Sequence, residues 1–155
     1  MMLDRLEYIR SKIDIRLSQM DEDSRKYAII HLYGVSQYAS MLALQRGLDV
    51  ELSAIAGMLH DIAQYQENIY QGHAERSGIL AKELLMNTGM FQPDEITIIV
   101  QAIHHHSDKT NRHGPYDELL KDADVLQHYF YHPNQQISAS EQYRLYYLLE
   151  AIKQK

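Results

Sequence analysis

A scarcity of chain breakers is the feature that most restricts the fold of this sequence. The 155 residues contain seven glycines and three prolines, and the stretches between them are rich in Leu, Ile, Ala, Gln and Glu, which favour helices. Apolar residues recur three and four positions apart, as at Ala28, Leu32, Val35, Ala39 and Leu42, which is typical of one helix face. Alternating strand patterns are scarce. The sequence therefore predicts an all-α protein, a helical bundle of about six to seven helices.

Capping residues, prolines and glycines predict where the helices begin and end. Ser24 is expected to cap a helix that ends at Arg46, before Gly47. Pro93 and Pro115 fit the first position of two later helices. The remaining helices are expected over residues 3–20, from about 50, over 73–89, and after the capping box of Ser138 and Glu141.

Length, cysteine content and charge limit the class of protein. One domain over residues 1–155 is expected, because the chain has the size of an ordinary domain and no linker-like segment divides it. The absence of cysteine excludes disulfides and thiolate-bound metals. A net charge of −6 argues against general binding to nucleic acid. Neither a membrane-spanning run nor a signal peptide is recognised, so we expect a cytoplasmic protein without a membrane partner.

Histidine and aspartate fall on the expected inner helix faces. His31 borders the apolar stripe described above, His60 and Asp61 lie beside Leu59 and Ile62, His106 extends an isoleucine stripe, and Asp124 follows Leu120 by one turn. Polar groups converging in a core are costly unless they are paired or bind a cation, and imidazole and carboxylate are suitable ligands for divalent metals. Taken singly, each histidine is also explained as an ordinary core residue, and a His-Asp pair arises easily by chance.

Three segments, in this order, resemble the HD-domain superfamily of metal-dependent phosphohydrolases. They are His31-Leu-Tyr-Gly-Val35, Ala56-Gly-Met-Leu-His60-Asp61 and Lys121-Asp-Ala-Asp124. The resemblance implies an all-helical scaffold on which His31, His60, Asp61 and Asp124 hold one divalent metal.

Two further segments resemble the branches of this superfamily that carry extra histidines. Gly72-His73-Ala74 and the segment from Ala102 to Ser107 match these branches, which include dinucleoside tetraphosphate hydrolases and cyclic dinucleotide phosphodiesterases. The resemblance implies that His73 and His106 hold a second metal bridged by Asp61, with His105 as a lesser candidate. It thus implies one or two divalent ions per chain, with Fe or Mn favoured and Mg, Zn, Ni or Co also compatible.

Position 64 departs from the pattern of these branches. Gln64 stands where the two-metal branches commonly have Lys near the substrate phosphate and other branches have Glu for proton transfer. A glutamine forms hydrogen bonds but supplies no charge and takes no proton at neutral pH. Lys109 and Arg112, in the expected loop before Pro115, are the first candidates for phosphate-binding cations, although each is also explained as a solvated surface charge. The expected catalytic set is therefore Asp61, Gln64, Lys109 and Arg112.

These observations predict a metal-dependent phosphohydrolase that cleaves a phosphate ester or anhydride of a nucleotide-like substrate with a metal-activated water. One alternative is a catalytically idle HD module that binds metal or nucleotide as a regulatory or interaction domain. Another is a helical interaction protein whose histidines have no common role. The expected partner is a small phosphorylated compound rather than a nucleic acid, and the chain is expected to be a monomer or a homodimer.

Overall fold

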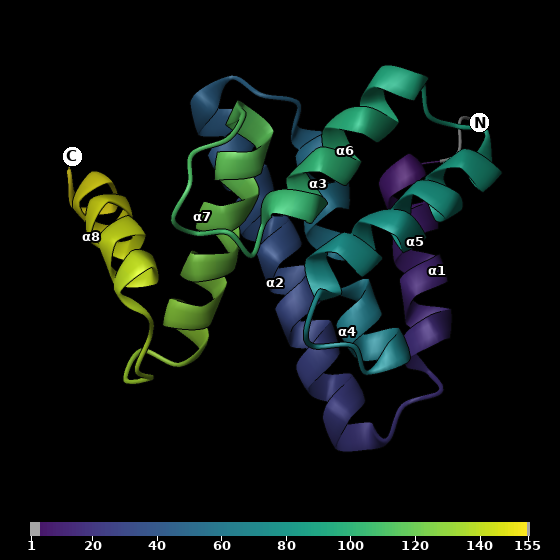
Figure 1. The fold of residues 1–155 in the computed structure, drawn as a ribbon, viewed down its shortest axis with the longest axis horizontal. Helices are drawn as coiled ribbons and strands as arrows, with labels where there is room; N and C mark the ends of the chain where they lie inside the picture. The colour runs from purple at the N-terminus through teal and green to yellow at the C-terminus, as the bar shows by residue number, and fades with distance from the viewer. Residues whose placement is uncertain (1–3, 155) are drawn as a thin grey trace.

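The computed structural model describes residues 4–154 and contains eight helices and no strand within them (Figure 1). They are α1 (Arg5–Leu17), α2 (Glu22–Arg46), α3 (Val50–Leu59), α4 (Ile62–Glu67), α5 (His73–Thr88), α6 (Pro93–His105), α7 (Pro115–Tyr131) and α8 (Ala139–Lys153). The predicted all-α fold is confirmed.

Most helix ends follow the local sequence signals. Gly47 ends α2 in the left-handed conformation with φ 67°, Pro93 and Pro115 open α6 and α7, and Ser138 forms the capping box of α8. The N-cap prediction for α2 was wrong, because the carboxylate of Asp21 accepts the Ser24 backbone N–H and α2 therefore begins one turn earlier. The first helix also ends sooner than expected, at Leu17, and its expected start at Leu3 lies outside the described residues.

The expected third helix is divided at the His-Asp pair, which raises the number of helices above the predicted six or seven. Helix α3 ends at Leu59, and Asp61 adopts φ −113° and ψ 18° before α4 begins. The backbone N–H of Ala63 donates to the Ser77 hydroxyl of α5 at 3.0 Å, which anchors the start of α4. The break turns the side chains of His60 and Asp61 toward the same region of the core.

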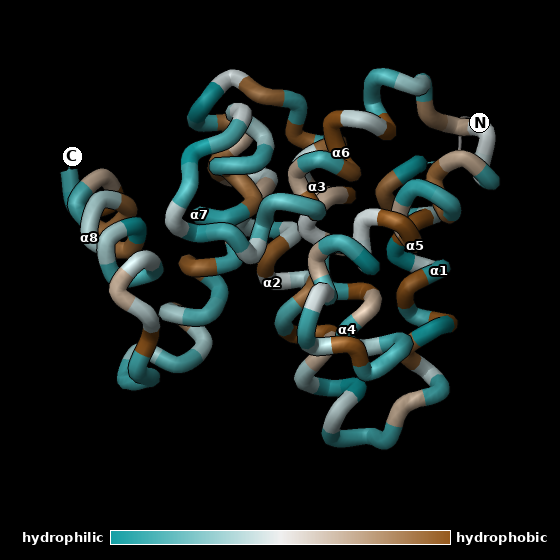
Figure 2. The backbone as a smooth tube through the Cα atoms, viewed as in Figure 1, coloured by the Kyte–Doolittle hydropathy of each residue, from teal (hydrophilic) through white to brown (hydrophobic). Residues whose placement is uncertain are grey.

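Helix α3 runs through the centre of the molecule, and all of its residues from Leu52 to Leu59 are buried. Apolar segments gather where α2, α3 and α6 meet (Figure 2). Gly57 permits the close packing of α3 on α2, because a Cβ at position 57 would lie 2.6 Å from the Cα of Ser36. This tight crossing fixes the position of His60 relative to His31.

Helix α8 lies at one edge of the bundle, beside α7 (Figure 1). Its inner face buries Leu145 and Leu148, whereas Tyr143, Tyr146 and Tyr147 remain exposed. Its first turn reaches the polar region described below. None of the described helices is long and apolar enough to cross a membrane.

Candidate metal centre

Four buried side chains from three parts of the fold meet in a first group, which consists of His31, His60, Asp61 and Asp124. The Nε2 atom of His31 lies 3.1 Å from His60 Nε2, 3.0 Å from Asp61 Oδ2 and 3.5 Å from Asp124 Oδ1. His60 Nε2 lies 3.2 Å from Asp61 Oδ2 and 3.5 Å from Asp124 Oδ1. Neighbouring ligands at about 2.1 Å from one metal ion are roughly 3.0–3.4 Å apart. The four atoms thus have the spacing of a coordination sphere.

A second group uses the other oxygen of the same aspartate and consists of Asp61, His73 and His106. Asp61 Oδ1 lies 3.2 Å from His73 Nε2 and 3.0 Å from His106 Nε2, and the two nitrogens are 3.2 Å apart. Asp61 therefore belongs to both groups, one oxygen to each.

The protonation of the four histidines is set by partners on the far side of each ring. The Nδ1 atoms of His60, His73 and His106 each face a backbone carbonyl, at 2.7 Å, 2.8 Å and 2.7 Å, and His31 Nδ1 faces Gln127 Oε1 at 2.6 Å. Because a carbonyl oxygen only accepts, each Nδ1 carries the proton and donates it. Each Nε2 atom is then the ring nitrogen that faces the rest of the cluster, which is the arrangement of metal-binding histidines.

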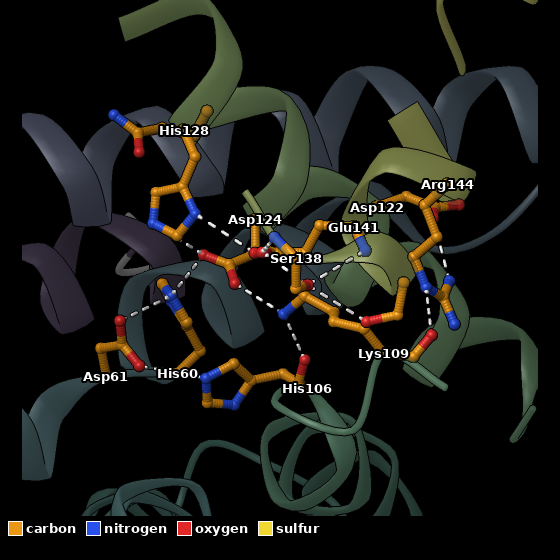
Figure 3. A network of polar contacts seen from close by, with 12 residues as sticks. His60, Asp61, His106, Lys109, Asp122, Asp124, His128, Ser138, Glu141 and Arg144 are labelled. Atoms are coloured by element: carbon orange, nitrogen blue, oxygen red, sulfur yellow. Dashed lines mark hydrogen bonds and ion pairs between the residues drawn. The ribbon is translucent and has the colours of Figure 1, made fainter. Parts of the chain in front are cut away.

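The carboxylate of Asp124 also fits a site for a cation. Its Oδ1 atom is buried without any hydrogen-bond partner, while its Oδ2 atom accepts from Lys109 Nζ at 2.7 Å (Figure 3). A buried carboxylate oxygen without a partner is costly, and a divalent ion among the facing nitrogens would satisfy it. The cluster is therefore able to hold a divalent metal.

Charges within the cluster keep both carboxylates ionised. Burial favours the neutral acids, but His60 beside Asp61 and Lys109 beside Asp124 hold the pKa of both carboxyl groups well below the usual range. Burial disfavours the charged form of His60, but Asp61 and Asp124 outweigh it and raise the pKa of His60 to about 10. Burial lowers the pKa of His106. A proton on His60 thus competes with a metal ion for the first group.

The cluster opens into a pocket of about 360 Å³. Besides candidate ligands, its walls contain Tyr27, Gln64, Tyr65, Ser107, Lys109, His128, Ser138, Ser140 and Glu141. Gln64 lies in this wall, on the side of the metal cluster that its helix position predicted. The pocket is thus formed by α2, α4, the first residue of α5, α7, the first turn of α8 and the segment after α6.

Lys109 and Arg112 were expected to bind the substrate phosphate, but the structure gives them other surroundings. Lys109 lines the pocket, but its ammonium group is already held by Asp124 and by the His106 carbonyl. Arg112 does not line this pocket and is exposed in another groove of about 710 Å³, which is lined by α2, α7, α8 and the segment after α6. The backbone explains this, since Lys121 binds the Asn111 carbonyl at 2.7 Å and Arg144 binds the Lys109 carbonyl at 3.0 Å, which holds the loop toward α7 and α8.

His105 lies outside both ligand groups. Its Nδ1 faces Asp117 Oδ1, and its ring stacks on His113 with 3.9 Å between centroids. His104 is exposed, as its helix position predicted.

Sequence reasoning missed several residues of the pocket wall, above all His128 and Glu141. His128 follows Asp124 by four residues on α7, so its place on the same face was readable from helical spacing. Glu141 is brought in by the docking of α8 on α7, for which the sequence carries no local signal.

The chain belongs to the HD domain family, whose model matches residues 28–129 and thereby contains all six candidate ligands. The family expected from the sequence is confirmed.

Similar proteins agree with this assignment. Ribonuclease Y of Thermus thermophilus is 34% identical over 97 residues, which are 62% of this chain and 15% of that protein. Ribonuclease Y of Clostridium perfringens is also 34% identical over 97 residues, which are 17% of its length. The chain therefore spans about a sixth of the length of these curated relatives. A solved structure of a predicted HD superfamily hydrolase from an uncultured Thermotogales bacterium shares the fold, with a TM-score of 0.63 and 23% identity over 92% of this chain and 88% of that one.

Proposed function

We propose that this protein is a metal-dependent phosphohydrolase that cleaves a phosphate ester or anhydride of a nucleotide-like compound. The observation that carries the proposal is the convergence of four histidine Nε2 atoms on the two oxygens of Asp61, with each Nδ1 atom already engaged. Such an arrangement suits a pair of divalent ions that share one carboxylate.

Bound divalent ions would lower the pKa of a coordinated water and polarise the phosphoryl oxygen of a substrate. The side chains around them would position the ions and the substrate. Asp61 would hold both ions with its two oxygens, and Lys109 would keep Asp124 oriented through the 2.7 Å ion pair. The amide of Gln64, in the pocket wall, would donate a hydrogen bond to the substrate phosphate, while Tyr27 and Tyr65 would border its organic part.

The similarity to Ribonuclease Y favours a second candidate, the cleavage of a phosphodiester bond in RNA. The matched segment of 97 residues covers 62% of this chain. The net charge of −6 opposes this candidate, because binding to a polyanion depends on many basic contacts.

A screen for hydrolysis, followed by phosphate release and by chromatography of the products, tests the proposal. The purified protein would be assayed with nucleoside mono-, di- and triphosphates, dinucleotides and a short RNA, each with added Mn²⁺ or Fe²⁺. We expect release from a small nucleotide that is abolished in Asp61→Ala. Cleavage of RNA alone would support the second candidate, and metal-dependent binding without turnover of any compound would identify an idle HD module instead.

A further inference from the structure

The pocket around the metal cluster is poor in positive charge. Among the described residues that line it, Asp61, Asp124 and Glu141 are acidic and Lys109 is the one Lys or Arg. Three carboxylates against one ammonium group give these side chains a formal charge of −2. The other wall residues are tyrosine, serine, glutamine and histidine, which present hydroxyl, amide and ring groups.

The single lysine is not available to a substrate. Lys109 Nζ lies 2.7 Å from Asp124 Oδ2 and also donates to the His106 carbonyl, and its side chain is 9% exposed. Gln64 occupies the wall position at which a second cation would be most effective. No free Lys or Arg of the described pocket wall therefore faces a substrate, and bound metal ions would be the main source of positive charge.

Glu141 places a fixed negative charge in the same wall. Its Oε2 atom accepts from the Ser138 backbone N–H at 3.1 Å and from the Ser138 hydroxyl at 2.9 Å, within the capping box of α8. Its Oε1 atom lies 4.0 Å from His128 Nδ1 (Figure 3). These contacts hold the carboxylate in place, so it does not swing away when an anion enters. Glu141 lies on α8, outside the residues that match the HD domain model. The negative charge therefore comes from a helix beyond the matched segment.

We propose that the pocket selects substrates with a single phosphate group and rejects di- and triphosphates, and that Glu141 determines this specificity. The inference rests on the proposed function, because it assumes two bound divalent ions. Two such ions would bring the pocket to a formal charge of +2, which the dianion of a phosphate monoester balances. Each further phosphate group would add negative charge without a cationic partner and would be repelled by the Glu141 carboxylate.

Binding measurements on slowly hydrolysed analogues test this without relying on turnover. The metal-loaded protein would be titrated by calorimetry with adenosine 5′-thiomonophosphate and with the methylene-bridged analogues of ADP and ATP, at constant free metal. We expect the affinity to fall as the number of phosphate groups rises.

Glu141→Gln is the decisive variant, because glutamine also forms a capping box and preserves the size of the side chain. We expect it to raise the affinity for the ATP analogue on the order of tenfold and to change the affinity for the monophosphate analogue little. Gln64→Lys should also raise the affinity for the ATP analogue, because it adds a positive charge to the pocket wall. Glu150→Gln is the matched control on α8, since Glu150 pairs with Lys153 and does not line the pocket.

Tighter binding of the ATP analogue than of the monophosphate analogue by the wild-type protein, or an unchanged affinity of Glu141→Gln for the ATP analogue, would overturn the specificity proposal alone. If the metal-loaded protein bound none of the three analogues, the proposed function would fail as well.

Discussion

The two ligand groups that share Asp61 differ in number of ligands and in exposure. The first has four buried members, of which His31 and His60 have side chains 2% and 0% exposed. The second has three members, and the His73 side chain is 22% exposed. Metal sites closed by four protein ligands are typically structural, whereas catalytic sites keep an open position for water or substrate. We therefore expect that the first group would anchor an ion and that the second, less enclosed group would present one to the pocket.

The two ligand groups also differ in how firmly the fold holds their residues. His31 and Asp124 project from the interiors of α2 and α7, the two long helices that pack on each other. His73 is the first residue of α5 and follows Gly72, which has φ 70°. We therefore expect the first group to bind its ion more tightly than the second.

Loss of the shared carboxylate should have the largest effect. Asp61→Ala removes one ligand from each group, so we expect the loss of both ions and of all metal-dependent activity. A ligand present at about 1,000 times its Kd stabilises the folded state by about 4 kcal/mol, so the melting temperature of the metal-loaded protein should drop on the order of 10 °C. Metal analysis and calorimetry measure both effects. The exposed Asp23→Ala is the control, and retention of two ions by Asp61→Ala would remove the basis of the comparison.

Asp124 and Asp122 lie two residues apart on α7 but have different partners. Replacing each of them should therefore have different effects on metal content and activity. Asp124→Asn should lose the ion of the first group and most activity. Asp122 binds Arg46 at 2.7 Å and Arg144 at 3.1 Å, away from the cluster. Asp122→Asn should therefore keep its metal and activity and lose about 1 kcal/mol of stability. Metal content and activity measured side by side decide this, and the reverse order would show that the wrong aspartate has been assigned to the cluster.

His73→Ala should affect the second group alone. The metal content should fall from two ions to one, because the first group keeps its four members. His104→Ala provides the control, since His104 is exposed on α6 and should leave the content unchanged. Spectrophotometric titration with Co²⁺ counts the ions in each variant. A saturation at one ion in the wild-type protein, unchanged in His73→Ala, would show that His73 only begins a helix.

The smallest and most gradual effect should come from pH. The neighbouring carboxylates raise the pKa of His60 to about 10 in spite of its burial, so a metal ion must displace a proton. Metal affinity should therefore fall as the pH drops from 9 to 6, by up to about tenfold per unit for one displaced proton.

The metal-free protein should show the opposite trend in stability. A raised pKa contributes stability that is complete below the unfolded value of about 6.5 and is lost as the pH rises through about 10. The melting temperature of the metal-free protein should decline over this range, whereas the metal-loaded protein should not follow it. Equal pH profiles for the two forms would contradict the competition between proton and metal at His60.

The fold was predictable because its signals are local, whereas the set of six candidate ligands was expected from the resemblance to a known family. Helical stripes, prolines at helix starts and the Ser138 capping box each act within a few residues, and the spacing of His31 and His106 on apolar stripes indicated their inward direction. The division at Asp61 was missed because it depends on Ser77, which accepts the Ala63 backbone N–H from another helix.

The composition of the pocket wall was less predictable, because it also depends on contacts between segments that are distant in the sequence. Arg112 was expected near the substrate, but it lines another groove, because Lys121 binds the Asn111 carbonyl just before it. Glu141 enters the pocket only through the docking of α8 on α7, a contact between segments whose relative placement no periodicity reveals.

Anomalous scattering from crystals grown with Mn²⁺ tests the central claim, a two-metal centre bridged by Asp61, most directly. We expect two peaks about 3.5–4 Å apart, one among His31, His60, Asp61 and Asp124 and the other among Asp61, His73 and His106. No peak at the cluster, or a single peak that Asp61 touches with only one oxygen, would contradict the account.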